Sequence, residues 1–450
     1  MALSQTNINK LNSAARTSVN AEYERLSKNW GRKRWLALGN RYAGIDCIDL
    51  LKDDIQPGNS VNHQHLSEYI AASSISHCVD GWSYLGRAID AFLKGDTDSS
   101  RHLGYYAELR AAMSILASEG IGVFKNAHFV INTNRECELI KGSGTHEFTW
   151  DALECWADSN SARDLIFSII KPGTVPLSDW LNNFAVRASV QSLLTKEWLL
   201  LWGLDLRRLI EDREARNIAS YRPTTLTTPR PINPKAAIRF IYKLWEVLEP
   251  KETLRFPLLD RYLLRLSVKQ TFENAYGKTV SEEKVLFDRL IESMLQSTSP
   301  RELTIEGWKK FLNSKQVNNL PLVISEASEK ADITDAKHSQ QVLARATLLL
   351  RLSTGACRLM LDTLPMTSKS KLKFWWEKFG EDRCLWHSGE EPDDLTDLWV
   401  DIRESIDSAG QWLNNIKARD MSYKLLWERQ AAATDILGSS ERIALWGLGL

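Results

Sequence analysis

Proline is scarce in this chain and is concentrated in one place. The 450 residues include 13 prolines, and four of these lie between Pro223 and Pro234. Proline costs about 3 kcal/mol inside a helix, so long proline-poor stretches are free to form helices. Prolines that lie close together instead favour an extended backbone. The sequence therefore predicts a mainly α-helical protein whose helices are interrupted at 223–234.

The length predicts more than one domain. A chain of 450 residues is longer than one ordinary hydrophobic core requires, and two or three domains are usual at this length. We place the border at the proline-rich segment and expect a helical domain over 1–222, a linker over 223–234 and an all-helical domain over 235–450. The segment is equally compatible with an extended arm that lies over the surface.

The N-terminal half is predicted to combine a helical bundle with a small β insertion. Apolar residues within 66–118 recur at steps of three and four, which indicates amphipathic helices, and the turn Lys94-Gly95-Asp96 separates two of them. Two helices joined by a short turn pack antiparallel. Residues 121–150 differ, because short β-rich pieces alternate with Gly, Asn and Thr, so we expect a hairpin inserted there. Helical patterns return over 150–170 and 178–219.

The C-terminal half is predicted to contain one helix after another. No fixed repeat period is found, so the pattern does not favour a repeat protein. The expected helices are Ile238–Leu248, Leu258–Phe272, Ser281–Gln296, Thr304–Phe311, Gln340–Leu364, Lys371–Phe379, Leu395–Lys417 and Met421–Leu437.

Charge and cysteine usage narrow the class of protein. Lys and Arg number 57, as do Asp and Glu, which argues against a histone-type protein that is basic throughout but allows a local basic groove. The N-terminus lacks the apolar region of a signal peptide, and no apolar stretch reaches about 18 residues. The six cysteines are irregularly spaced, as in reduced intracellular proteins. We therefore expect a soluble, cytoplasmic protein with no membrane partner.

Motifs for metals and nucleotides are incomplete. His63 and His65 form one pair of potential ligands, and Cys384 and His387 form another, but a zinc site needs about four ligands at defined spacing. The sequence has no P-loop, no dinucleotide-binding glycine pattern and no nucleophile elbow. We expect neither a metal nor a cofactor.

One short segment combines cations with aromatic rings. Between residues 28 and 34 four basic residues interleave with Trp30, and Trp35 follows them. Nucleic-acid bases stack on aromatic rings beside cations, so the segment is a candidate contact for nucleic acid. It also fits an ordinary helix end whose tryptophans pack inward.

The segment Arg216-Asn217-Ile218-Ala219-Ser220-Tyr221 ends a helical run just before the proline-rich stretch. It resembles the motif of the HEPN superfamily of helical nucleotide-binding and ribonuclease domains, in which an Arg, usually followed by a polar residue, is separated from a His by four to six residues. The hairpin at 66–118 also resembles the family's bundle, so the resemblance spans roughly 66–222. The chain departs from the motif at Tyr221, five residues after Arg216, where a His is expected.

The resemblance implies chemistry on RNA at Arg216. Metal-independent cleavage uses the RNA 2′-OH as nucleophile, and it needs a proton-transfer group and a cation for the phosphorane. An Arg fork matches phosphate, Asn217 would orient the site, and Tyr221 would replace the His. Because tyrosine has a pKa near 10, Tyr221 is a poor base. The activity is therefore altered, or the domain binds RNA without cutting it.

Other residues near this motif are candidates for substrate binding. We select Arg213, Arg222 and His102, of which His102 starts the second helix of the predicted hairpin and also fits a solvated cap region. His146 follows Gly144-Thr145, and we interpret it as part of a turn packed under a helix rather than as catalytic.

The resemblance implies an intracellular protein that acts on or binds RNA, with roles in phage defence, toxin systems or RNA processing. HEPN sites often form across a homodimer.

In the ordinary interpretation, Arg216 merely satisfies the last carbonyls of its helix. A competing hypothesis is a non-catalytic helical scaffold in a larger complex. The 17 tryptophans could supply its binding surface. Residues 381–404, with nine acidic and two basic residues, could bind a basic partner.

Overall fold

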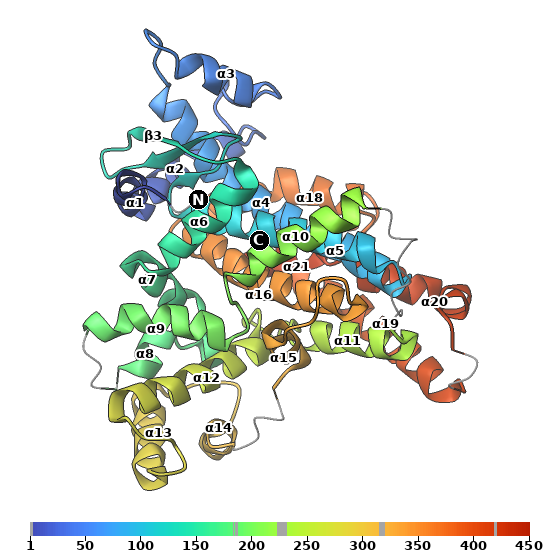
Figure 1. Ribbon diagram of the computed structural model, residues 1–450. Helices are drawn as coiled ribbons and strands as arrows, with labels where there is room; N and C mark the ends of the chain where they lie inside the picture. Colours follow the sequence, from blue (N-terminus) through green and yellow to red (C-terminus); the bar gives the residue numbers. More distant parts are fainter. Residues whose placement is uncertain (1–2, 183, 185–187, 223–231, 315–319, 418–420) are drawn as a thin grey trace.

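The computed structural model describes residues 3–182, 184, 188–222, 232–314, 320–417 and 421–450 (Figure 1). Helices make up most of this part of the chain, together with one small sheet, so the predicted mainly α-helical fold is confirmed. None of the helices in these residues is both long enough and apolar enough to cross a membrane.

The helices before the proline-rich segment include one long hairpin, formed by the helices over 63–93 and 97–118. They are α1 (Gln5–Asn12), α2 (Arg16–Trp30), α3 (Cys47–Asp54), α4 (His63–Leu93), α5 (Thr97–Ser118), α6 (Thr145–Ala157), α7 (Asn160–Ile169), α8 (Leu177–Leu181), α9 (Ala188–Leu201) and α10 (Arg208–Tyr221), with a 3-10 turn at Pro172–Thr174.

Helices α4 and α5 form the hairpin that the sequence predicts at 66–118. The turn between them has Gly95 in the left-handed region, with φ 81°, and Asp96 begins α5 by accepting a hydrogen bond from the Ser99 N–H at 3.0 Å. The helical pattern over 178–219 gives the three helices α8, α9 and α10. Gly203, with φ 96°, lies in the turn that separates α9 from α10.

The predicted β insertion is present as a three-stranded antiparallel sheet. Its strands are β1 (Ile121–Gly122), β2 (Ala127–Ile131) and β3 (Cys137–Lys141), in the order β1-β2-β3. Phe129 faces Gly122 on one side and Leu139 on the other. The Lys10 ammonium of α1 donates to the Leu139 carbonyl at 2.6 Å, so the first helix covers this sheet.

The C-terminal half is helical throughout its described residues. Its helices are α11 (Pro234–Glu246), α12 (Pro257–Tyr276), α13 (Lys284–Thr298), α14 (Ile305–Leu312), α15 (Leu322–Ser328), α16 (Ala336–Leu361), α17 (Met366–Lys369), α18 (Lys373–Asp382), α19 (Leu398–Asn415), α20 (Tyr423–Gly438) and α21 (Glu441–Leu448), with 3-10 turns at Ser370–Leu372 and Leu395–Asp397.

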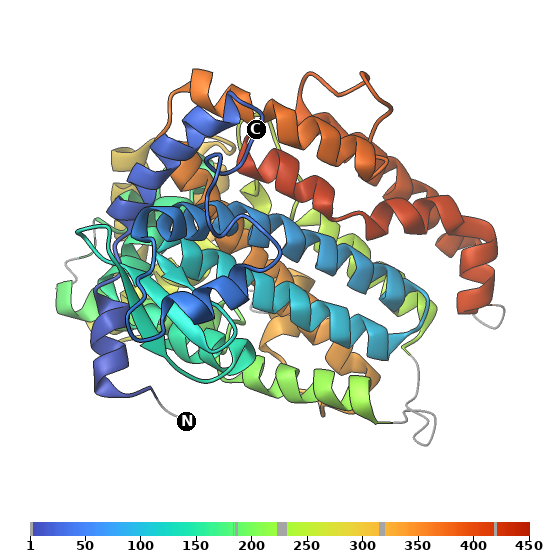
Figure 2. The ribbon, with the colours of Figure 1, turned by 90° about the horizontal axis from the view of Figure 1, so that it is seen from above.

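Helices from both sides of the predicted domain border share one hydrophobic core. Helix α16 lies against α4 and α5, and Figure 2 shows α10 and α20 on opposite sides of that pair. The Trp82 indole N–H donates to Thr354 Oγ1 at 2.9 Å, and the Ser440 hydroxyl donates to the Trp82 carbonyl. Of the predicted linker, residues 223–231 lie outside the described residues, and α11 begins at Pro234.

This shared core predicts a large effect for Gly86→Ala. Gly86 lies on α4, and a Cβ there would overlap the Gly438 carbonyl oxygen and lie 3.0 Å from the Ser440 nitrogen. Overpacking of this kind costs about 1–3 kcal/mol, more than the ~1 kcal/mol that alanine gains over glycine in a helix. We expect a lower melting temperature by calorimetry.

Gly410→Ala on α19 is the matched control, because the nearest atom to its new Cβ belongs to Tyr242 at 4.0 Å. It should keep or raise the melting temperature. A Gly86→Ala protein that melts no lower than the original chain would contradict the close packing of α4 against α20 and α21.

Candidate functional site around Arg216

Arg216 lies on α10 and is held between two aromatic rings and a histidine. Its side chain is nearly buried, with 7% of its surface exposed. The guanidinium carbon lies 5.3 Å from the ring centre of Tyr105 and 5.5 Å from that of Tyr106, both on α5. These distances are within the range of cation–π attraction. Nη2 of Arg216 donates to Nε2 of His146 at 3.2 Å.

His146 joins the site from the first turn of α6. A guanidinium can only donate hydrogen bonds, so the His146 Nε2 must accept from Arg216 and carry no proton. The other ring nitrogen, Nδ1, is 3.0 Å from the Tyr105 hydroxyl. Burial, followed by the charges of Arg216 and Arg213, lowers the pKa of His146. The ring is therefore neutral at pH 7.

His102 approaches Arg216 from α5. Its Nδ1 is 2.7 Å from the Ser220 hydroxyl, and that hydroxyl donates to the Arg216 carbonyl at 2.8 Å. Because the hydroxyl hydrogen is used there, His102 Nδ1 is the donor, and Nε2 is left as an acceptor without a hydrogen-bond partner in the described part of the chain. Burial and then the charge of Arg216 lower the pKa of His102 as well.

The positive charge of Arg216 is not balanced by a neighbouring carboxylate among the described residues. Among the described residues Arg216 forms no ion pair with a carboxylate, and its Nε has no hydrogen-bond partner. A buried cation without a counter-charge is costly. An anion that reached Arg216 would remove that cost, so the site favours a negatively charged ligand.

Asn217, Tyr221 and Arg222, which were also predicted for this site, do not lie on the face of α10 that carries Arg216. Each residue turns a helix by about 100°, so Asn217 and Tyr221 point away from the face that carries Arg216. Tyr221 is 79% exposed, and Asn217 and Arg222 are exposed too. Within the described residues neither Asn217 nor Tyr221 shares a hydrogen bond with the histidines. Arg213 is half-buried near His146.

Sequence reasoning therefore selected Arg216 and His102 but missed the role of His146. That histidine lies 70 residues from Arg216 along the chain, in a segment interpreted as a structural turn. No local pattern in the sequence connects the two. Only the packing of α6 and α10 against α5 places them together.

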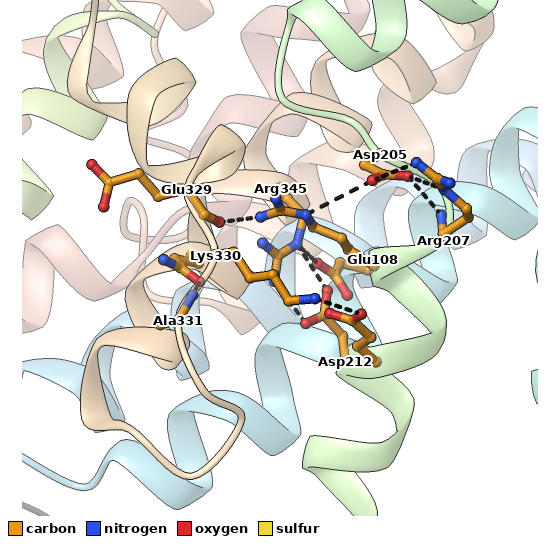
Figure 3. Close-up of polar contacts among 11 residues, drawn as sticks. Glu108, Asp205, Arg207, Asp212, Glu329, Lys330, Ala331 and Arg345 are labelled. Carbon is orange, nitrogen blue, oxygen red and sulfur yellow. Dashed lines mark hydrogen bonds and ion pairs between the residues drawn. The ribbon is translucent and has the colours of Figure 1, made fainter.

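A buried network of charged residues surrounds Asp212 of α10, which precedes Arg216 by one helical turn (Figure 3). Arg345 of α16 donates from Nε and Nη2 to the Asp212 carboxylate at 2.8 and 2.6 Å, and its Nε is 3.6 Å from Glu108 of α5. His338 Nε2 is 3.2 Å from the same Asp212. All four side chains are at least 96% buried.

The two acids of this network differ in charge. Burial and the negative Asp212 raise the pKa of Glu108 well above its usual range, so Glu108 is neutral. Burial alone would raise the pKa of Asp212, but the charge of Arg345 and the hydrogen bond from His338 hold it below its usual value. The ionised pair Asp212–Arg345 therefore fixes α10 against α16. Since Asp212 and Arg216 are one turn apart, this pair also sets the position of Arg216.

The basic segment after α2 forms a separate exposed surface. Trp30 is buried, as the structural interpretation expects, whereas Trp35 is half-buried with its ring 5.2 Å from that of Trp375. The four basic residues between 28 and 34 are exposed and form no ion pair with any described residue. Cations beside a partly accessible tryptophan suit contacts to nucleic acid.

Comparisons with known proteins add no relative: no family model matches the sequence, and neither the curated proteins nor the solved structures give a match. In the part of the chain that the structure describes, no group of three or more His, Cys, Asp or Glu residues could hold a metal ion. The function must be argued from the geometry around Arg216.

Proposed function

We propose that the protein is a HEPN-like, RNA-directed protein whose site is the Arg216–His146–His102 cluster, either a metal-independent endoribonuclease or an RNA binder. The observation that carries the proposal is the buried Arg216, which has no carboxylate partner among the described residues and lies beside two neutral histidines. A phosphate group of RNA would supply the negative charge that Arg216 lacks. The exposed cations beside Trp35 support RNA binding independently.

In this proposal the two histidines take the part that the sequence motif gave to Tyr221. His102 Nε2 takes the proton of the 2′-OH as its oxygen bonds to phosphorus, and Arg216 stabilises the charged phosphorane. Once Arg216 turns to the phosphate, His146 Nε2 is free to bind a proton and give it to the departing 5′-oxygen. The products are a 2′,3′-cyclic phosphate and a 5′-OH. Tyr221 and Arg222, exposed at the end of α10, contact the RNA beside the site.

The resemblance also guides the biological setting. We propose that the protein works in the cytoplasm, in phage defence or a toxin-type system, with a second copy or another protein as partner. The scaffold alternative has weaker support, because none of the 17 tryptophans is exposed. Its acidic segment is also partly paired within the chain, for example Lys373 with Glu391 at 3.1 Å.

The decisive experiment is cleavage of labelled mixed-sequence RNA in EDTA, with Arg216→Ala compared with the original chain. Loss of a group that stabilises transition-state charge costs about 10²–10³-fold in rate, so we expect cleavage to fall by that factor and RNA affinity to fall with it. If the protein binds RNA without cutting it, only the affinity should fall.

Arg239→Ala is the matched control, since Arg239 is an exposed arginine on α11 away from this site. Arg216→Lys keeps the charge but loses the fork and should show an intermediate defect. Melting curves of all three variants would separate loss of function from unfolding. Equal cleavage and equal RNA affinity for Arg216→Ala and Arg239→Ala would refute the proposed site.

A further inference from the structure

A cavity with a volume of about 150 Å³ lies where α7, α12 and α16 meet, remote in sequence from Arg216. One water molecule needs about 10–15 Å³ on the same scale, so the cavity has room for a small molecule. Ile169, Phe256 and Leu359 contribute apolar wall. Pro257, the first residue of α12, also lines the cavity, and the dipole of that helix adds positive potential there.

Cations outnumber acids around this cavity. Its charged lining consists of Lys171, Arg255, Arg351, Arg358, Asp260 and Asp362. Arg351 and Asp260 neutralise each other, because Nε and Nη2 of the arginine donate to the two carboxylate oxygens at 2.9 and 2.8 Å. Asp362 is shared between Arg358, at 3.5 Å, and Lys369.

Arg255 lacks a close counter-charge in the described part of the chain. Among the described residues it forms no ion pair, and its Nε is buried without a hydrogen-bond partner. Nη1 of Arg358 is buried and unpartnered in the same way. Burial, and then the charge of Arg358, lower the pKa of Arg255 by more than Asp394 and Asp362, neither of which forms an ion pair with it, raise it. The cavity lining therefore combines an excess of cations with buried N–H groups that have no hydrogen-bond partner among the described residues.

We propose that this cavity binds a small organic phosphate. The phosphate group accepts hydrogen bonds from Arg255 and Arg358, whose planar forks match its oxygens better than a single ammonium does. Lys171, exposed at the rim, attracts the anion. The organic part lies against Ile169 and Leu359. This inference does not depend on RNA cleavage at Arg216.

The test is calorimetric titration of the full chain with phenyl phosphate, inorganic phosphate and phenylacetate. We expect phenyl phosphate to bind more tightly than either of the others, because only it joins a phosphate to an apolar group. Arg255→Gln should weaken its binding at least tenfold, while Arg239→Gln, at an exposed position on α11, should leave it unchanged.

Melting curves without ligand give a second readout. Because Arg255→Gln removes an unpaired cation, the ligand-free variant should melt at the same or a higher temperature while losing the stabilisation by phenyl phosphate. Failure of phenyl phosphate to bind at millimolar concentration would overturn the proposal, as would unchanged binding by Arg255→Gln. Equally tight binding of phenylacetate would overturn the assignment to phosphate.

Discussion

Replacing Asp212 with asparagine should lower the free energy of unfolding by about 3–5 kcal/mol, the usual cost of leaving one partner of a buried ion pair alone. Arg345 would keep its charge in a site where its side chain is 2% exposed, and one of the two carboxylate oxygens that accept from Arg345 and His338 would become an NH2 donor. Urea unfolding at pH 7 measures the change. Asp212→Leu combined with Arg345→Met should recover most of the loss, because it removes both charges.

Glu108→Gln is the matched control for this prediction. Glu108 is as deeply buried as Asp212, but its raised pKa makes it neutral in the folded protein. An acid whose pKa is raised by folding stabilises the protein at low pH and loses that contribution as pH rises above about 4.3, its unfolded value. Glu108→Gln should therefore leave stability at pH 7 unchanged or higher. A larger loss for Glu108→Gln than for Asp212→Asn would contradict the charges assigned here.

On the proposed function, His102→Asn and His146→Asn should each slow RNA cleavage by about 10²–10⁴-fold, the usual contribution of a general acid or base. Burial and Arg216 lower the pKa of both rings. The base must be neutral and the acid protonated, and both pKa values lie below the ordinary 6.5. We therefore expect the cleavage rate to peak below pH 6.5 and to fall as pH rises further, in a profile measured on labelled RNA.

Tyr221→Phe is the control that separates this geometry from the sequence motif. The motif puts Tyr221 in the place of the family's histidine, whereas the structure leaves it 79% exposed on another side of α10. The variant should change the cleavage rate little and should keep the same pH profile. A loss with Tyr221→Phe as large as that with His102→Asn would contradict the roles given to the histidines.

Much of the fold follows from local patterns, because helix periodicity and proline placement act over a few residues. The α4–α5 hairpin, the β insertion and most C-terminal helices were predictable in this way, with ends that shift by a few residues. The short helices α15 and α21 were not predicted, although α14, with eight residues, was. Their stability comes from tertiary packing.

The candidate site was predictable only in part, because its contacts join distant residues. Arg216 and His102 stood out by residue type, but Asp212 and Arg345 are 133 residues apart, and no pattern pairs them. Arg345, Arg351 and Arg358 interrupt the apolar stripe of α16. Each proves to have a specific place: Arg345 against Asp212, Arg351 against Asp260, and Arg358 beside the cavity.

The shared core bears on how the chain folds as it is synthesised. Trp82 bonds to Thr354 and Ser440, 272 and 358 residues further along, so the contact order of the central helices is high. High contact order slows folding and prolongs the exposure of apolar faces. When residue 222 leaves the ribosome, α4 and α5 still lack α16 and α21. We therefore expect nascent or truncated chains to aggregate or to need a chaperone until α21 has emerged.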